Sequence, residues 1–430
     1  MSSQRALASG RRASATVAIA GAAAFALGCA AGNLPATSTK HTAPTAVQPV
    51  TQPPSQPAPA AKPAQAQAAT SVDRPSLSRV LGQTIIARFI GSSPSGAFLA
   101  RVRAGRIGGV ILFAENVAGG ESATRSVIER LQQAAAEGKN PPLLIMTDQE
   151  GGEVRRLTWA PPVRAPLSMS SGVARAEGEA TGEALRSVGI NVDLAPVADV
   201  ERVAGSFLHT RAFGRDPTVV AENACLFAEG LAKEGVGYTL KHFPGLGRAL
   251  TNTDTQPTTI QASAADLRAD YLPYQTCGAQ PGALVMVSSA IYPSLGSSGP
   301  AVLTPQIYSS ELPSATGGTP VTISDDLQAA GLQAESAPAE RAINAGLDLL
   351  LYAQTEAGSE TAFQRLLDVA KSGGIRRERL EAARLAILGL KGTVAGATAS
   401  STGVPVEAQE PTPESSGTPE TIPPQVETEK

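Results

Sequence analysis

Short apolar runs recur along the middle of the chain, and each is separated from the next by a longer segment of mixed polarity. The runs are rich in β-branched residues and predict strands, while the segments between them are long enough to hold helices. Eight such runs occur, namely Thr84–Ile90, Gly109–Phe113, Leu143–Thr147, Asn191–Pro196, Gly237–Leu240, Ala283–Ser288, Pro320–Ser324 and Leu347–Leu351. Eight alternating units predict an α/β fold, a (β/α)8 TIM barrel.

Several of the intervening segments have the apolar spacing of amphipathic helices. They are Glu121–Glu137, Arg175–Val188, Val219–Glu234 and Arg376–Leu390. Gly189 and Gly235 are typical helix C-terminal stops, and Asp216 followed by Pro217 is a typical helix start. Because strand-helix-strand crossovers are right-handed, we expect parallel strands whose carboxyl ends all lie on one face of the barrel.

Both ends of the chain lack this periodicity. Residues 30–74 are mainly Pro, Ala, Gln and Thr, which predicts a disordered spacer, and residues 394–430 form an acidic tail that we also expect to be disordered. One folded domain, residues 75–393, remains, and we expect it to be a monomer. A net charge of −3 without a clustered basic face argues against nucleic acid as a partner. Only three histidines are present, so we expect no metal and no cofactor.

The N-terminus predicts export from the cytoplasm. Three arginines precede an uncharged run that extends from Ala13 to Ala30, as in an export signal, here residues 1–29. The segment Ala26–Cys29 resembles a bacterial lipoprotein signal, in which Cys29 would carry the lipid and anchor the protein to the membrane. A cleaved secretory peptide and an uncleaved membrane anchor are the alternatives. The predicted location is the cell envelope or the exterior.

Two cysteines, Cys225 and Cys277, lie in the predicted domain. Two cysteines are too few for a disulfide scaffold. A single bridge between them is one option, and we favour two buried thiols.

Polar residues follow most of the predicted strands and should meet at one rim of the barrel. They are Asn116, Asp148, Asp199, Lys241 with His242, Ser288 with Ser289, Asp325 and Tyr352. For Asn116, Asp199, Ser288 and Tyr352, a local role in capping a helix or a loop is an equally good interpretation. The others predict a site in the mouth of the barrel.

Asp325 has the position required of a nucleophile. It comes directly after the seventh run, at the strand exit, and a carboxylate there can attack an anomeric carbon to form a glycosyl-enzyme intermediate. Asp326, one residue later, is better placed to complement the N-terminus of a following helix.

The segment Asp148–Gly152 offers a carboxylate beside two glycines, with Arg156 just beyond, and these groups can bind sugar hydroxyl or amide groups. A local ion pair between Asp148 and Arg156 is the alternative interpretation. Arg211 and His209 lie in the loop after the fourth run, and we leave His209 out of the site.

Five segments in this order resemble the N-terminal barrel domain of glycoside hydrolase family 3, especially its single-domain β-N-acetylglucosaminidases. They are Gly108–Phe113, Asp148–Gly152, Arg211–Pro217, Lys241–Gly245 and Ser324–Leu327. The likeness covers roughly residues 76 to 392. The resemblance implies that Asp325 is the nucleophile and that Asp148, Arg156, Arg211, Lys241 and His242 hold the sugar at the −1 position. Without the family, Lys241 at a strand exit could instead form the Schiff base of an aldolase.

The chain departs from the family after Gly245. The usual continuation is Phe-Pro-Gly-His-Gly and then, on a mobile loop, Asp-Ser-His, whose histidine is the acid/base. Here Leu246 replaces the first histidine, and Asn252–Asp254 aligns with Asp-Ser-His. Either Asp254 is the acid/base on a closed, poorly solvated loop, which is the outcome we favour, or the loop carries no working acid.

We therefore expect an exported retaining glycosidase that removes terminal β-linked N-acetylglucosamine from peptidoglycan-derived or related glycans. The alternatives are a weakly active or inactive cell-envelope protein that binds carbohydrate without the histidine acid/base, and an enzyme with β-glucosidase or xylosidase activity.

Overall fold

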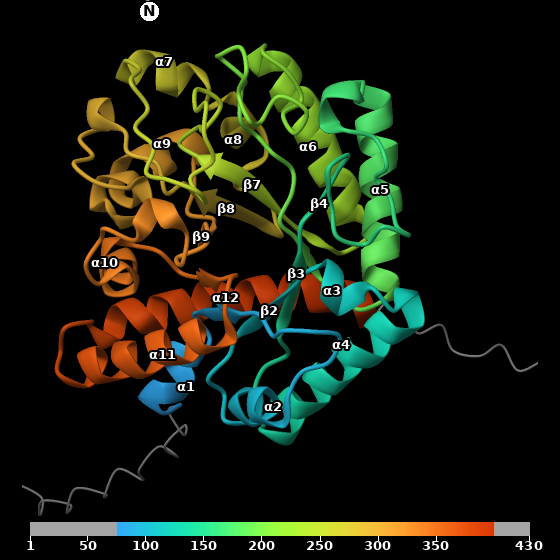
Figure 1. The fold of residues 1–430 in the computed structure, drawn as a ribbon, viewed down its shortest axis with the longest axis vertical. Helices are drawn as coiled ribbons and strands as arrows, with labels where there is room; N and C mark the ends of the chain where they lie inside the picture. The colour runs from blue at the N-terminus through green and yellow to red at the C-terminus, as the bar shows by residue number, and fades with distance from the viewer. Residues whose placement is uncertain (1–74, 400–430) are drawn as a thin grey trace, which may run out of the picture. The chain divides into compact units, whose positions relative to one another are not determined.

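The computed structural model describes residues 75–399 of the chain, with side chains to residue 395. Eight parallel strands form one sheet, in the order β10-β1-β2-β3-β6-β7-β8-β9. The strands are β1 Ile85–Ala87, β2 Gly109–Leu112, β3 Leu144–Thr147, β6 Val192–Asp193, β7 Gly237–Phe243, β8 Ala283–Val287, β9 Val321–Ser324 and β10 Leu350–Tyr352. The backbone of Leu349 binds that of Thr322 and Ser324, which joins β9 to β10. The sheet is therefore a closed barrel, as the sequence predicted (Figure 1).

Helices alternate with the strands. They are α1 Leu77–Gly82, α2 Gly96–Arg103, α3 Ala114–Val117, α4 Gly120–Glu137, α5 Ser171–Ser187, α6 Pro217–Lys233, α7 Ala264–Ala269, α8 Leu272–Cys277, α9 Leu312–Thr316, α10 Pro338–Ala345, α11 Glu356–Lys371 and α12 Arg377–Ala399. Asp216 caps α6 through the backbone N–H groups of Thr218 and Val219, as expected. Gly189 and Gly235 follow α5 and α6 with positive φ, which a glycine adopts without strain.

The strand β7 is longer than predicted. The expected strand ended at Leu240, whereas β7 continues to Phe243 and includes both Lys241 and His242. The ladder continues because the Lys241 carbonyl accepts a hydrogen bond from the backbone N–H of Ala198 at 2.7 Å. Their side chains are therefore fixed by the sheet rather than by a loop.

The helix α12 closes the N-terminal end of the barrel. Its residues Ile387, Leu390 and Val394 belong to the same buried apolar cluster as the inward-facing residues of the strands. At the same end, the buried Lys391 donates to Gln83, just before β1, at 2.8 Å. The helix predicted to end at Leu390 thus runs on to Ala399, because its second half plugs the barrel interior.

The two cysteines correct an expectation. We favoured free thiols, but Cys225 of α6 and Cys277 of α8 form a disulfide bond with their Cα atoms 5.7 Å apart. The helices α6 and α8 pack against each other, which brings together two cysteines 52 residues apart in the sequence.

The export signal, Cys29, the spacer to residue 74 and most of the acidic tail lie outside the described residues. Within residues 75–399, no helix combines the length and apolarity needed to cross a membrane.

Candidate active site

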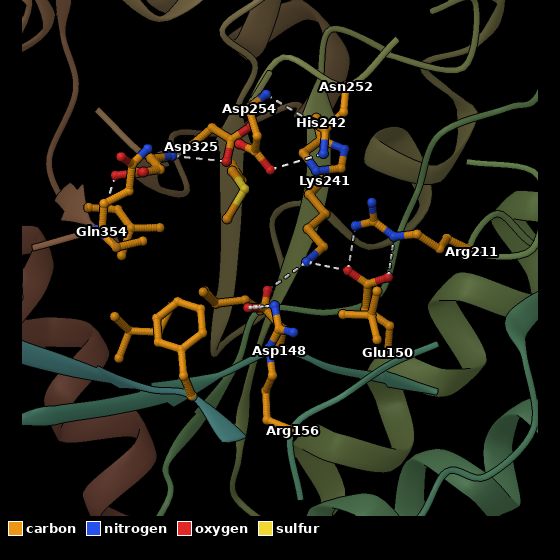
Figure 2. Close-up of a pocket in the computed structure, with 18 of the residues that line it drawn as sticks. Asp148, Glu150, Arg156, Arg211, Lys241, His242, Asn252, Asp254, Asp325 and Gln354 are labelled. Atoms are coloured by element: carbon orange, nitrogen blue, oxygen red, sulfur yellow. Dashed lines mark hydrogen bonds and ion pairs between the residues drawn. The ribbon is translucent and has the colours of Figure 1, made fainter. Parts of the chain in front are cut away.

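A cavity of about 400 Å3 opens at the carboxyl ends of the barrel strands. Polar and charged groups from the ends of five barrel strands face it, with Phe113, Phe207 and Met286 supplying apolar wall. Figure 2 shows two groups of side chains in it, one around Asp254, Asp325 and His242 and the other around Lys241. A cavity of this composition suits a small polar ligand with an apolar face, such as a sugar.

Lys241 lies at the centre of the second group and is almost fully buried. Its Nζ is 2.6 Å from Glu150 and 3.0 Å from Asp148. Arg211 binds Glu150 through two parallel bonds of 2.7 Å, and Arg156 lies 3.3 Å from Asp148. Five buried or half-buried charges thus hold one another in place, which preorganises their remaining hydrogen-bonding capacity for a ligand.

The protonation states of these groups follow from this arrangement. Burial alone would raise the pKa of Glu150, but Arg211 and Lys241 outweigh it, and the pKa lies far below its usual range. Burial would likewise lower the pKa of Lys241, yet Glu150 and Asp148 raise it. A lysine with a raised pKa stays protonated and is a poor Schiff-base nucleophile, so its environment argues against the aldolase alternative.

Two interpretations of Arg156 were made from the sequence, a local ion pair with Asp148 and a place in the predicted site, and its position is compatible with both. It forms the local ion pair with Asp148, and it also lines the cavity. Its guanidinium lies over the ring of Phe113, 5.2 Å from the ring centroid, and Arg88 lies 4.4 Å from the same centroid. The ring keeps Arg156 directed along the cavity wall.

His242 is oriented by Asp199. Its Nδ1 is 2.7 Å from Asp199 Oδ2, and because a carboxylate can only accept, Nδ1 carries a proton. The same carboxylate accepts from the backbone N–H of His242 and of Leu246. Asp199 thus both orients the His242 ring and caps the loop after β7, whereas Asn116 and Ser288 accept from backbone N–H groups close to them in the chain, as local caps do.

Asp325 comes directly after β9, the neighbour of β8 in the sheet, and lines the cavity. Its Oδ1 accepts from the backbone N–H of Asp326 at 2.9 Å. Burial, followed by the negative charge of Asp254, raises the pKa of Asp325 to about 6, while His242 opposes the rise. At neutral pH the carboxylate is still ionised, as attack on a carbon centre requires.

Asp254 lines the same cavity from the loop after β7. We expected a closed, poorly solvated loop around Asp254, and for Asp254 itself this expectation is wrong. Thr253 is fully buried, but Asp254 itself is exposed at the cavity mouth. Asp325 is thus the less exposed carboxylate of the two.

Asp326 does not cap a helix, contrary to expectation. No helix begins there; its Oδ1 accepts from the backbone N–H groups of Gln328 and Ala353, at 3.1 and 3.0 Å. These bonds tie the loop after β9 to the loop after β10, because the two loops meet across the closure of the barrel.

All of the residues selected from the sequence for the sugar site lie on this one cavity, namely Asp148, Arg156, Arg211, Lys241, His242, Asp254 and Asp325. Glu150 was missed, although it lies inside the Asp148–Gly152 segment. The pattern that could have identified it is the alternation of side chains in an extended segment, which places residues 148 and 150 on the same side. Phe207 and Gln354 also line the cavity, and no pattern in the sequence marked them.

Residues 82–390 match the family described as "Glycosyl hydrolase family 3 N terminal domain". The chain belongs to glycosyl hydrolase family 3. This membership, together with its relatives, makes the chain a glycosidase that is similar to β-hexosaminidases.

Two curated relatives differ in how they are described. An "Uncharacterized secreted glycosyl hydrolase" of Arthroderma benhamiae is 34% identical over 282 residues, 63% of this chain and 80% of the relative. A "Beta-hexosaminidase" of Bordetella avium is 31% identical over 283 residues, 62% of this chain and 79% of the relative.

Two solved structures share the fold. A family 3 β-N-acetylglucosaminidase from Paenibacillus matches with a TM-score of 0.71 and 28% identity, over 80% of this chain and 65% of that chain. A β-N-acetylhexosaminidase from Beutenbergia cavernae matches with a TM-score of 0.67 and 30% identity, over 74% of this chain and 99% of that chain.

Proposed function

We propose that this chain is a retaining exo-glycosidase that releases terminal β-linked N-acetylglucosamine. The observation that carries the proposal is the presence of two carboxylates at different depths of one cavity, Asp325 inside and Asp254 at the mouth. Retaining glycosidases use two such carboxyl groups, about 5–5.5 Å apart when the sugar is bound, one as nucleophile and one as acid/base.

The reaction would proceed in two displacements. Asp325 attacks C1 of the sugar, the bond from C1 to the aglycone oxygen breaks, and Asp254 gives its proton to that oxygen. Water then attacks C1, Asp254 takes a proton from the water, and the bond between C1 and Asp325 breaks. Inversion twice at C1 gives a β-product. The charge on Asp254 in the second step repels phosphate, which favours water as the acceptor.

Three groups would hold the sugar at the −1 position. Lys241 and Asp148 form one donor-acceptor pair facing the cavity, and His242, held by Asp199, presents its second ring nitrogen. Arg156 and Arg211 supply further donors, each fixed by a carboxylate. Since the cavity is near the lower end of the size range of ligand sites, it favours a single terminal sugar with the aglycone outside.

We further propose export to the cell envelope, with peptidoglycan-derived glycans as substrates. Support comes from the signal-like N-terminus with Cys29, from the secreted relative, and from the Cys225–Cys277 disulfide, which suits an oxidising compartment. Lipid attachment at Cys29 would make the protein a membrane-anchored lipoprotein.

The test of catalysis uses a nitrophenyl β-N-acetylglucosaminide with Asp325→Asn and Asp254→Asn variants. We expect the first change to abolish turnover and the second to lower it on the order of 10²–10⁴-fold. Asp368→Asn, in the exposed part of α11 and paired with Lys371, is the matched control and should keep full activity. An α-configured product by NMR, or full activity of Asp325→Asn, would refute the proposal.

A silent carbohydrate-binding protein is the second candidate, and the observation in its favour is Asp254 in place of the histidine. Saturable sugar binding by calorimetry without turnover of any leaving group would decide for it. A panel of aryl glucosides, xylosides and N-acetylglucosaminides separates the proposed sugar from the β-glucosidase or xylosidase alternative.

A further inference from the structure

The loop that carries Asp254 is attached to the segment that follows the nucleophile strand. The backbone N–H of Ala330 donates to the Asp254 carbonyl at 3.1 Å, and that of Gly331 donates to the Thr253 carbonyl at 3.0 Å. Ala330 and Gly331 belong to a short 3-10 turn that begins a few residues after Asp325. The two carboxylates are therefore connected through one stretch of backbone.

Gly331 leaves no room for a side chain at this contact. A Cβ atom built on it would lie 2.7 Å from the Thr253 carbonyl oxygen, closer than real Cβ atoms come to another heavy atom. Thr253 is fully buried, so it has little freedom to retreat. A methyl group at position 331 would push the backbone of Thr253, and Asp254 would move with it.

The side chain of Asn252 adds a second restraint. Its Nδ2 donates to Asp254 Oδ2 at 3.0 Å, and its Oδ1 accepts from the backbone N–H of Asp254, also at 3.0 Å. Figure 2 shows Asn252 next to Asp254, whose carboxylate lies between Asp325 and His242. The backbone and the carboxylate of Asp254 are thus each held.

We propose that Gly331 is a positioning residue for the acid/base, and that the chain delivers Asp254 on a segment docked in advance against the loop of its own nucleophile. This inference rests on the proposed function. The docking has a direct chemical consequence, since a displacement of about 1 Å in a reacting group can cost about 100-fold in rate. An aspartate is also shorter than the histidine it replaces, so the backbone that bears it has to be placed more accurately.

The test compares Gly331→Ala with Gly172→Ala. Gly172 lies in the first turn of α5, where a Cβ would meet nothing within 4 Å, so this control should leave activity unchanged. For Gly331→Ala we expect kcat/KM on a phenyl β-N-acetylglucosaminide, whose poor leaving group needs the acid, to fall about 10–100-fold. On a dinitrophenyl substrate, which needs little acid assistance, we expect glycosylation to change less than threefold.

A double-mutant cycle separates positioning from damage to the fold. If Gly331 acts through Asp254, Gly331→Ala should cause no further loss in an Asp254→Asn background, whereas independent damage would add. Equal losses on both leaving groups, or additivity in the cycle, would overturn the inference. If Gly331→Ala does not fold, Asn252→Ala replaces it in the test, because this change removes a restraint on Asp254 and adds no atoms. Asn252→Ala should show the same dependence on the leaving group. Equal losses on both substrates would overturn the inference here too.

The two proposals fail in different ways. If Asp254→Asn keeps full turnover on the phenyl substrate, Asp254 is not the acid and the proposed function loses its second carboxylate. If Asp254→Asn is impaired and Gly331→Ala is not, only the positioning role is wrong.

Discussion

Replacing Glu150 with glutamine removes the charge that holds the cationic part of the cavity together. In the folded protein Glu150 contacts Lys241 Nζ at 2.6 Å and both Arg211 Nε and Nη2 at 2.7 Å. A glutamine offers one oxygen instead of two, and its amide nitrogen would face a cation. Lys241 would keep Asp148, but Arg211 would lose its bidentate partner.

The magnitude follows from burial. The Glu150 side chain is 1% exposed and those of Lys241 and Arg211 are 3% and 14% exposed, so solvent screens the contacts little. Removing one partner of a buried ion pair typically costs about 3–5 kcal/mol. At about 2.1 cal/mol/K per residue, unfolding roughly 320 residues has an entropy near 0.7 kcal/mol/K, so Tm should fall by about 4–7 °C. Because the pKa of Glu150 is depressed, this stabilisation is present above its unfolded value of about 4.5 and is lost as pH falls further.

Urea denaturation at pH 7 measures the effect, with the fluorescence of Trp159, the single tryptophan, and far-UV circular dichroism as probes. Glu153→Gln is the matched control, since Glu153 is an exposed neighbour on the same segment and accepts from Thr210. We expect the control to change the unfolding free energy by less than about 0.5 kcal/mol. If the unfolding free energy of Glu150→Gln lies within 1 kcal/mol of that of the control, the ion pairs of Glu150 do not stabilise the fold as argued.

Three further predictions concern protons and the disulfide. The pH profile of kcat/KM should fall on the acid side with an apparent pKa near 6, where Asp325 takes up a proton. Asp254→Asn removes a neighbouring negative charge and should lower this apparent pKa. An apparent pKa below 4.5 in the wild type would contradict the assignment. Burial raises the pKa of Asp193 to about 8, so this group stabilises the fold at low pH and the contribution is lost as pH rises towards 8, by up to about 1.4 kcal/mol per pH unit. Denaturation between pH 4 and 8 should show a shallower slope for Asp193→Asn, and parallel slopes would exclude the role. Replacing Cys225 and Cys277 together by serine should lower the unfolding free energy by about 2–4 kcal/mol, and an unchanged denaturation midpoint would speak against a stabilising bond.

Strands and long helices could be predicted because their signal is local. A strand such as Ala283–Val287 or a helix such as Pro217–Lys233 has its periodicity, cap and stop within a few residues, and each expected element appears with shifted ends. One of these shifts, the extension of β7 to Phe243, depends on the backbone of Ala198, which no pattern within β7 reveals.

By itself, then, the sequence determined the alternation of strands and helices, the barrel and the set of polar residues at the carboxyl ends of its strands, because repeating patterns and strand order suffice for these. Only the tertiary structure decided the partners: Glu150 between Lys241 and Arg211, Asp199 behind His242, the bridge between α6 and α8, α12 inside the barrel floor, and Gly331 beneath the Asp254 loop. Each of these contacts joins segments distant in the sequence, and closure of the barrel is what brings them within bonding distance.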